Sequence, residues 1–259
     1  MANLGHMREP GDLFDLTGKV ACITGASSGL GRRATLTLAA AGARVVAVAR
    51  SADPLDSLCK EIGASAARVV ADVGDRANLA QTAQDISTPF GAPDILVHAA
   101  GINTREPADD VTPEGWDQTL ALNLSAPFFL SQAFVPAMRA KGWGRIVNFA
   151  SLQATRAFPA GIAYGTTKAG IVQMTRAMAE AWSRDGITAN AIGPGFFPTK
   201  LTATVFEDDA RSARNAAQTC VGRNGTMGDI DGPILFLCSD ASTYVTGQLL
   251  MVDGGFTAK

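Results

Sequence analysis

Short apolar runs rich in Val and Ile alternate along the chain with longer segments in which apolar side chains recur at helical spacing. The short runs predict buried strands and the longer segments predict helices. Strands are expected at 19–24, 44–49, 67–71, 94–98, 145–149, 188–192 and 248–253. Helices are expected at 32–41, 53–62, 75–88, 112–141, 160–184 and 229–238. This alternation indicates βαβ units, and therefore an α/β fold with one doubly wound parallel sheet of about seven strands and helices on both faces.

The chain shows no internal repeat, low-complexity tract or linker, so a single domain is expected over 16–259. Residues 1–15 are mostly polar and are expected to form a loose N-terminal extension. The segment 196–227 has a mixed, irregular pattern. Long irregular excursions in compact domains are usually functional, so this segment is predicted to form a lid over the substrate.

Composition narrows the classes of function. The chain is 47% apolar with a net charge of -2 and no basic cluster, which argues against nucleic acid as a main partner. No apolar run reaches the length of a membrane span, and residues 1–15 lack the apolar core of a signal peptide, so a cytoplasmic protein without a membrane partner is expected. The four cysteines lack C-x-x-C spacing and there are only two histidines, so no metal site is expected.

A glycine-rich turn follows the first predicted strand and opens the first predicted helix, with the sequence G-A-S-S-G-L-G over 25–31. Glycines permit a tight turn and a close approach of the backbone, and a helix N-terminus presents free N–H groups to a phosphate. An ordinary strand-to-helix turn can carry the same glycines, but the βαβ context favours a dinucleotide site of the Rossmann type. The candidate phosphate-binding residues are Gly25, Ser27, Ser28, Gly29, Leu30 and Gly31.

The ends of the next strands supply candidates for the rest of a dinucleotide site. The second strand ends at Arg50, without an acidic residue. An acidic side chain there would bind the 2′-hydroxyl of NAD, whereas an arginine suits the 2′-phosphate of NADP, so NADP is favoured over NAD. Asp72 closes the third strand with Val73 and can accept a bond from the adenine amino group. Small residues that leave room for a flat ligand follow the fourth strand: Ala99, Ala100 and Gly101.

Tyr164 and Lys168 lie four residues apart in a predicted helix, so they stack on one face. An ammonium group favours phenolate over phenol and is expected to lower the pKa of the tyrosine, which makes the phenol a candidate general acid and base. Ser151 follows the fifth strand and offers a hydroxyl that can hold a substrate oxygen. Many surface helices carry a tyrosine and a lysine at this spacing, so the pair alone does not indicate a catalytic site. Other motifs of the chain must support that interpretation.

These motifs together resemble those of the short-chain dehydrogenase/reductase family. The resemblance runs from about Leu16 to Phe256 and includes the 24–31 turn, the ends of the third and fourth strands, and the Tyr164–Lys168 pair. The resemblance also rests on Asn123, Ser151, Pro194 with Gly195, Thr199, and the closing V-D-G-G at 252–255. The chain departs from the family pattern at His98, where family members usually have an asparagine. We expect His98 to be buried and hydrogen-bonded, and a role in sensing pH is the alternative.

The resemblance implies a catalytic tetrad of Asn123, Ser151, Tyr164 and Lys168. In that scheme Tyr164 is the general acid and base and Ser151 polarises the substrate carbonyl. Lys168 lowers the tyrosine pKa and binds the nicotinamide ribose, and Asn123 positions a water that links Lys168 to solvent. The residues implied to line the nicotinamide are Pro194, Gly195 and Phe197, with Thr199 reaching its carboxamide.

Candidate substrate residues flank Ser151 and Tyr164, and they are Gln153, Phe158, Phe196 and Arg105. The two phenylalanines suggest a partly apolar wall, and an arginine can clamp a carboxylate, although packing and solvent-exposed roles stay open. The 190–202 run looks like gluconate 5-dehydrogenase-like members of the family, and 3-oxoacyl-carrier-protein reductase-like members are nearly as similar.

Three functions follow. The first is an NADP(H)-dependent oxidoreductase that interconverts a secondary alcohol and a ketone in a small molecule, with a sugar acid as the candidate substrate. The second is a 3-oxoacyl thioester reductase on the same fold. The third is a non-catalytic dinucleotide-binding regulator, which the presence of both Tyr164 and Lys168 argues against. The resemblance also implies a homotetramer.

Overall fold

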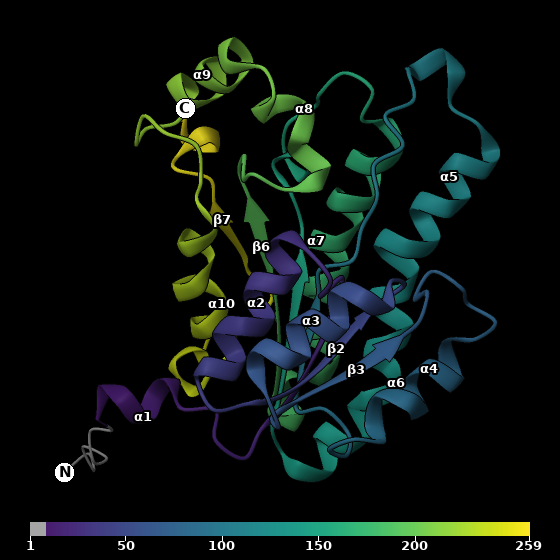
Figure 1. The fold of residues 1–259 in the computed structure, drawn as a ribbon, viewed down its shortest axis with the longest axis vertical. Helices are drawn as coiled ribbons and strands as arrows, with labels where there is room; N and C mark the ends of the chain where they lie inside the picture. Colours follow the sequence, from purple (N-terminus) through teal and green to yellow (C-terminus); the bar gives the residue numbers. More distant parts are fainter. Residues whose placement is uncertain (1–8) are drawn as a thin grey trace.

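The computed structural model describes residues 9–259 and contains one seven-stranded sheet (Figure 1). All strands pair in parallel, in the order β3-β2-β1-β4-β5-β6-β7. The strands are β1 (Val20–Thr24), β2 (Arg44–Ala49), β3 (Ala66–Val70), β4 (Ile95–His98), β5 (Gly144–Phe149), β6 (Ile187–Pro194) and β7 (Leu249–Val252). The strand order reverses between β1 and β4, and ligands of such sheets bind beyond the carboxyl ends of the strands at this point.

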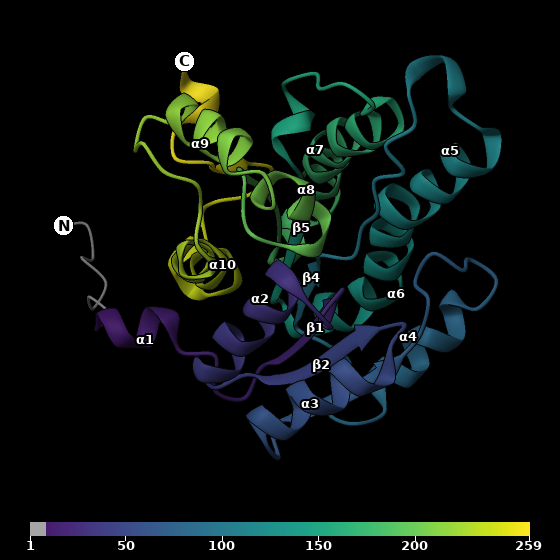
Figure 2. The ribbon, with the colours of Figure 1, turned by 45° about the horizontal axis from the view of Figure 1, so that its top comes forward.

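Helices cover both faces of the sheet (Figures 1 and 2). The α-helices are α1 (Pro10–Phe14), α2 (Gly29–Ala40), α3 (Ala52–Ile62), α4 (Leu79–Ser87), α5 (Pro113–Leu120), α6 (Ala126–Lys141), α7 (Ile162–Trp182), α8 (Ala203–Phe206), α9 (Asp209–Gln218) and α10 (Asp231–Cys238). One apolar core joins the sheet to α2, α3 and α10, and a second joins it to α4, α6 and α7. The predicted α/β fold with a doubly wound parallel sheet is confirmed.

The central strands show why the sequence forms a two-sided core. Every residue of β1 is buried. Ala21 and Ile23 belong to the core under α2 and α10, whereas Val20 and Cys22 belong to the core under α6 and α7. Successive side chains of a strand point to opposite faces, so a continuously apolar run fills both cores at once.

Helix α4 begins later than the sequence pattern predicts. The predicted helix starts at Asp75, but the Asp75 carboxylate accepts bonds from the backbone N–H of Ala77 (3.1 Å) and from Asn78 Nδ2 (2.7 Å). These bonds close a local turn, so the helix starts at Leu79. At the N-terminus, Pro10–Phe14 of the expected extension forms the short helix α1, which begins with a proline and carries an acidic residue in its first turn. Residues 1–8 of that extension lie outside the described residues.

The helix expected over 112–141 runs without a break, but its middle is π-helical at Ala121–Ser125. Pro127 is accommodated in the first turn of α6, and Pro136 lies inside that helix. Within residues 9–259, Pro113–Lys141 is the one helical stretch that is long and apolar enough to cross a membrane by length and composition, which the sequence analysis did not expect. Its α6 part packs on α4 and β5.

Candidate active site

The glycine-rich turn between β1 and α2 has no room for side chains. Gly25 has a φ of 71°, and a Cβ there would lie 2.7 Å from the backbone nitrogen of Ala100. A Cβ on Gly31 would overlap the carbonyl oxygen of Gly25. Ser28 is the N-cap residue of α2 but makes no capping bond, so its hydroxyl is available beside the free N–H groups of the first turn. This cradle fits a phosphate group.

The end of β2 places a cation at the same rim. The Arg50 side chain is 64% exposed, and its Nη1 lies 3.9 Å from Asp72 Oδ2. The pair is loose, so the guanidinium keeps donors for a phosphate. Asp72 also accepts a bond from the backbone N–H of Gly74 (2.9 Å), which orders the loop after β3. Val73 is buried in the core beneath this loop.

His98 ends β4 and is buried, with 4% of its surface exposed. Its Nε2 lies 2.9 Å from Ser131 Oγ, and the Ser131 hydroxyl donates to the Pro127 carbonyl (2.7 Å). Because the hydroxyl proton is used in that bond, Nε2 carries the proton in the His98–Ser131 bond. Burial lowers the pKa of His98 to about 3, so the imidazole is neutral over the physiological range. The expected buried, hydrogen-bonded histidine is confirmed.

Replacing His98 with Asn is expected to make the protein less sensitive to acid. The unfolded histidine takes up a proton near pH 6.5, whereas the folded one does so only near pH 3. The free energy of unfolding is therefore fully present above pH 6.5 and falls by about 1.4 kcal/mol per pH unit as the pH drops through this window. Urea unfolding at pH 7 and pH 4 should show that the wild type loses about 3 kcal/mol relative to His98→Asn. Parallel stability curves would contradict this account.

Tyr164, Ser151 and Lys168 meet beyond the end of β5. Tyr164 lies in the first turn of α7 with 8% of its surface exposed, and Ser151 hydrogen-bonds with its phenol. Lys168 is one turn further along α7, 5% exposed, with Nζ 5.5 Å from the centre of the Tyr164 ring. The Lys168 ammonium donates to the Phe149 carbonyl at 2.6 Å. The predicted helical stacking of the pair is thus present in the structure.

The pKa of Tyr164 shifts in the direction opposite to the one that the sequence predicts. Burial raises the pKa of Tyr164, and the Ser151 hydrogen bond and the Arg105 charge oppose this rise without cancelling it. The sequence predicted a lowered pKa for Tyr164, but burial dominates and the pKa is raised. The Lys168 ammonium donates to the Phe149 carbonyl. Burial also lowers the pKa of Lys168 to about 8, because the charged form loses solvation.

Asn123 sits in the π-helical turn between α5 and α6 and is 1% exposed. Its Nδ2 donates to the Ile102 carbonyl (2.8 Å) and to Thr167 Oγ1 (3.2 Å), and its Oδ1 accepts from the Ile102 N–H (2.9 Å). A Cβ on Gly101 would lie 3.3 Å from Asn123 Oδ1 and 3.7 Å from Lys168 Nζ, so the three residues converge. The amide therefore fixes the loop after β4 beside Lys168. π-Helical turns are often found at functional sites.

The segment after β6 passes over the glycine-rich turn. Gly195 lies so close to β7 that a Cβ would be 2.8 Å from Asp253 Cα. Thr199 contacts the turn itself, because a Cβ on Gly29 would lie 3.2 Å from the Thr199 methyl group. Phe197 was expected to line a nicotinamide, but its ring is 2% exposed and packs against Gly225 inside the base of the 196–227 segment.

The candidate substrate residues lie around the mouth of the site. Phe158 and Phe196 pack against each other with ring centres 6.2 Å apart. Both also contact Phe256 near the C-terminus, with ring centres 6.4 Å and 5.7 Å from it. The Arg156 guanidinium lies 5.5 Å from the centre of the Phe256 ring. Phe256 was missed as a site residue, because only the fold brings the last turn of the chain beside the loop after β5.

Arg105 connects the loop after β4 to the 196–227 segment. Its Nη1 donates to Thr204 Oγ1 (3.1 Å), and its Nη2 donates to the Leu201 carbonyl. Its backbone is left-handed, with a φ of 58°, which is uncommon for a residue with a side chain. Gln153 lies on the other side of Ser151, with its Oε1 against Gly161.

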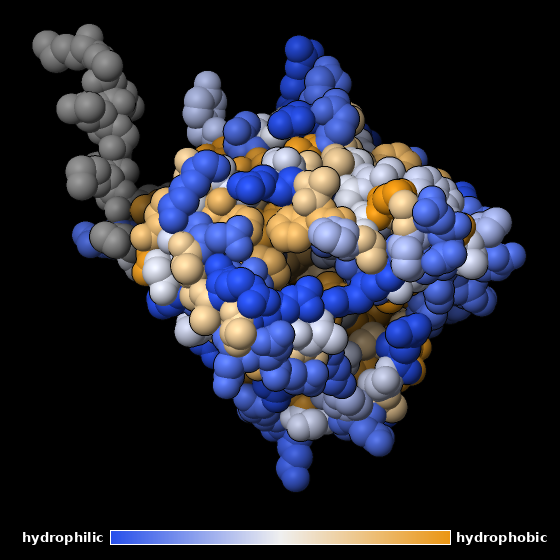
Figure 3. Space-filling model, turned by 90° about the horizontal axis from the view of Figure 1, so that it is seen from above, coloured by the Kyte–Doolittle hydropathy of each residue, from blue (hydrophilic) through white to orange (hydrophobic). Residues whose placement is uncertain are grey.

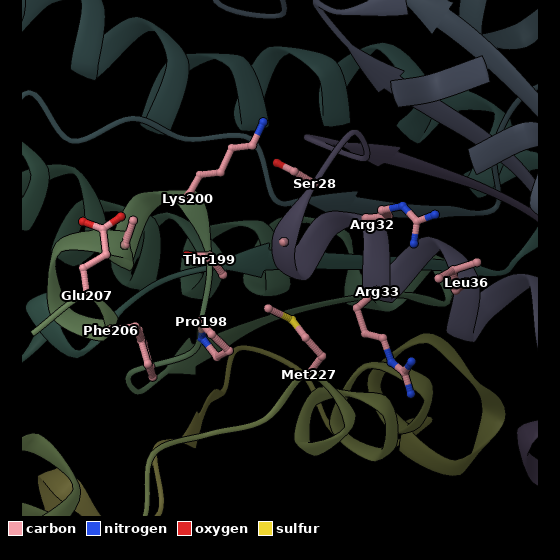
Figure 4. A pocket seen from close by; sticks show the side chains of 12 residues that line it. Ser28, Arg32, Arg33, Leu36, Pro198, Thr199, Lys200, Phe206, Glu207 and Met227 are labelled. Carbon is pink, nitrogen blue, oxygen red and sulfur yellow. The ribbon is translucent and has the colours of Figure 1, made fainter. Parts of the chain in front are cut away.

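The face that carries the strand ends is hollowed, with an apolar floor and a hydrophilic rim (Figure 3). A cavity of about 650 Å³ opens between α2 and the 196–227 segment (Figure 4). Its lining residues are Ser28, Gly29, Arg32, Arg33, Leu36, Pro198, Thr199, Lys200, Ala203, Phe206, Glu207 and Met227. Among residues 9–259, no group of three or more His, Cys, Asp or Glu side chains could hold a metal ion.

The sheet is doubly wound and parallel, and a phosphate cradle lies where its strand order reverses. A buried group of Ser151, Tyr164 and Lys168 lies beside that cradle. This combination defines a dinucleotide-dependent oxidoreductase. Comparisons with known proteins agree. Residues 25–257 match the family model described as enoyl-(acyl carrier protein) reductase. The chain therefore belongs to the short-chain dehydrogenase/reductase family.

The similar proteins include members of the family with named activities. The chain is 37% identical over 249 residues to gluconate 5-dehydrogenase of Gluconobacter oxydans (strain 621H), covering 95% of this chain and 97% of that protein. It is 35% identical over 242 residues to a 3-oxoacyl-[acyl-carrier-protein] reductase of Escherichia coli (strain K12), covering 93% and 98%. The crystal structure of a gluconate 5-dehydrogenase from Burkholderia cenocepacia J2315 in complex with NADP and tartrate is 36% identical, with a TM-score of 0.92 and coverage of 97% and 100%.

Proposed function

We propose that this protein interconverts a secondary alcohol and a ketone with NADP(H), on a polyhydroxylated carboxylic acid such as a sugar acid. The observation that carries the proposal is the convergence of Ser151, Tyr164 and Lys168 at the strand ends, beside the glycine-rich turn. A bound nicotinamide would supply or accept the hydride. The protein's own groups would hold the substrate oxygen and move the proton.

The proposed roles follow from the contacts of each side chain. Ser151 hydrogen-bonds with the Tyr164 phenol, so both hydroxyls can hold one carbonyl oxygen. Tyr164 would donate its proton to that oxygen in reduction and recover it from the alcohol in oxidation. The raised pKa keeps the phenol protonated, and therefore ready to donate, at neutral pH. Asn123 and the bond from Lys168 to the Phe149 carbonyl hold this group in place.

The cofactor assignment rests on the residues that would contact it. The glycine cradle at 25–31 fits the diphosphate, and the exposed Arg50 fits a 2′-phosphate. Asp72 lies beside Arg50, where it can accept a bond from the adenine. Thr199 contacts Gly29 through its methyl group and would reach the nicotinamide carboxamide. The related Burkholderia cenocepacia enzyme binds NADP in its crystal structure, which supports the same choice here.

Replacing Arg50 with Ala is expected to weaken NADPH binding by about tenfold or more and to leave NADH binding nearly unchanged. The reason is that a charge-assisted contact to the 2′-phosphate contributes on the order of 1.5–3 kcal/mol, and NADH lacks that phosphate. Fluorescence titration of both dinucleotides measures the two dissociation constants, with Arg68→Ala on β3 as the matched control. Equal weakening of both cofactors would show that Arg50 does not read the 2′-phosphate.

A sugar acid fits the mouth of the site. Arg105 and Arg156 bring two guanidinium groups to its rim, and the Arg105 charge acts on Tyr164. The similar gluconate 5-dehydrogenases act on a sugar acid, and the crystal structure of one is a complex with NADP and the hydroxy diacid tartrate. The similarity to the 3-oxoacyl-[acyl-carrier-protein] reductase keeps a thioester substrate as the second candidate. Kinetics over keto sugar acids, 3-oxoacyl thioesters and neutral ketones separate the two, and a higher kcat/KM for the thioester would overturn the sugar-acid assignment.

The 196–227 segment is proposed as the substrate lid of a single catalytic domain spanning 16–259. The Gly225 N–H donates to the Phe196 carbonyl (2.9 Å) and closes the base of the segment, while Arg105 contacts its outer part. We also propose a cytoplasmic homotetramer. Free cysteines suit a reducing compartment, and apolar side chains of α6, α7 and β7 are left exposed for subunit contacts: Phe129, Ile162 and Leu250.

A further inference from the structure

Lys200 begins the first turn of the 196–227 lid and lines the same cavity as Ser28 and Gly29. Figure 4 shows its side chain extending from the lid toward Ser28, at the start of α2. The neighbouring Thr199 already contacts the glycine-rich turn through its methyl group. The lid therefore carries Lys200 directly over the phosphate cradle.

The charges of this cavity single out Lys200. Arg32 forms an ion pair with Glu61, and Arg33 forms a two-bond ion pair with Asp231. Each of these guanidinium groups is thereby neutralised by a protein carboxylate. Lys200 has no ion-pair partner among residues 9–259, although Glu207 lines the same cavity. Among the described residues that line the cavity, Lys200 is thus the cation that no ion pair holds, and the lid also carries the acidic Glu207.

The opposite wall offers complementary groups for an anion. The Ser28 hydroxyl makes no capping bond, and the first N–H of α2 that bonds back along the helix is that of Arg32, so the N–H groups before it are free for an anion. An anion held there would meet the backbone donors of α2 on one side and the Lys200 ammonium of the lid on the other. Arg50 lies at the end of a different strand and would contact the ribose phosphate instead, so the two cations have separable roles.

We propose that Lys200 binds the diphosphate of the dinucleotide and so couples closure of the lid to cofactor occupancy. The inference rests on the proposed function, because the ligand is the cofactor assigned there. It goes further in naming a lid residue that reads a group common to NADPH and NADH. Lys200 is a positioning residue: it contacts the cofactor but not the reacting atoms.

The test is titration of the full-length protein with NADPH and with NADH, followed by cofactor fluorescence. Lys200→Ala is expected to raise both dissociation constants by about tenfold, since one charge-assisted contact is lost to either dinucleotide. Lys200→Arg should restore most of the affinity, and Lys60→Ala on α3 is the matched control for removing an exposed lysine. Hydrogen exchange supplies the second readout: NADPH should slow exchange in the lid of the wild type, and less so in Lys200→Ala.

The outcomes are distinct. If the wild type binds both cofactors and Lys200→Ala binds them equally well, Lys200 does not contact the diphosphate and the inference is overturned. If Lys200→Ala weakens NADPH alone, Lys200 reads the 2′-phosphate and the inference is also wrong. If the wild type binds neither dinucleotide, the proposed function falls and the inference falls with it.

Discussion

Replacing Tyr164 with Phe is expected to lower kcat by about 10²- to 10⁴-fold, the range found when a positioned general acid is removed. Phenylalanine keeps the ring over the Lys168 ammonium and removes only the hydroxyl that bonds Ser151. Because the side chain is 92% buried and the ring is retained, the thermal unfolding midpoint should change little. The measurement is NADPH oxidation at 340 nm with a keto sugar acid, together with a thermal melt of each protein.

The chain contains a matched control for this substitution. It has two tyrosines, and the other one, Tyr244, is fully exposed on the surface. Tyr244→Phe removes the same atom and should leave kcat unchanged. Turnover that persists in Tyr164→Phe at more than a tenth of the wild-type rate would show that another group moves the proton.

Replacing Gly31 with Val is expected to abolish dinucleotide binding, with a dissociation constant raised at least about 100-fold. A Cβ at this position overlaps the carbonyl oxygen of Gly25 and lies 3.3 Å from the Ala99 side chain. The turn must shift to relieve the overlap, and the shift displaces the N–H groups that hold the phosphate. Overpacking of this kind costs about 1–3 kcal/mol, so the free energy of unfolding should fall as well.

Gly232 provides the matched glycine. It lies in the first turn of α10 with no atom within 4 Å of the position of an added Cβ. Gly232→Ala should therefore bind NADPH normally and gain about 0.5–1 kcal/mol in unfolding free energy, because alanine is the better helix former. Isothermal titration calorimetry and urea unfolding measure both effects. Normal NADPH binding by Gly31→Val would mean that the turn does not form the phosphate site.

Much of the fold could be predicted from the sequence because the strands are buried on both faces. Such strands are continuous apolar runs, and β2 was placed at its observed ends. Helix ends were harder, because they depend on side-chain bonds that compete with the helix. The Asp75 carboxylate closed a local turn and delayed α4. The π-helical turn that places Asn123 leaves no mark in the apolar pattern.

Some features of the candidate site could also be predicted from the sequence, and others depend on the fold. Motifs that depend on neighbouring residues, such as the glycine-rich turn and the Tyr164–Lys168 pair, are visible in the sequence. Contacts between distant segments are not: Phe256 joins Phe158, and Arg105 reaches the lid nearly one hundred residues away. The raised pKa of Tyr164 also depended on the fold, because burial outweighs the local charges. Sequence reasoning considered the Tyr–Lys pair alone and predicted the opposite direction.

The central claim is that this protein transfers a hydride between NADPH and a carbonyl carbon while its own tyrosine supplies the proton. Incubation with a keto sugar acid and NADPH deuterated at C4 of the nicotinamide tests it directly, with the product analysed by mass spectrometry. The predicted result is an alcohol that carries one deuterium on the former carbonyl carbon, formed by the wild type and by Tyr244→Phe but not by Tyr164→Phe. Tight NADPH binding with no deuterium in any product of a broad carbonyl panel would contradict the account and favour a dinucleotide-binding regulator.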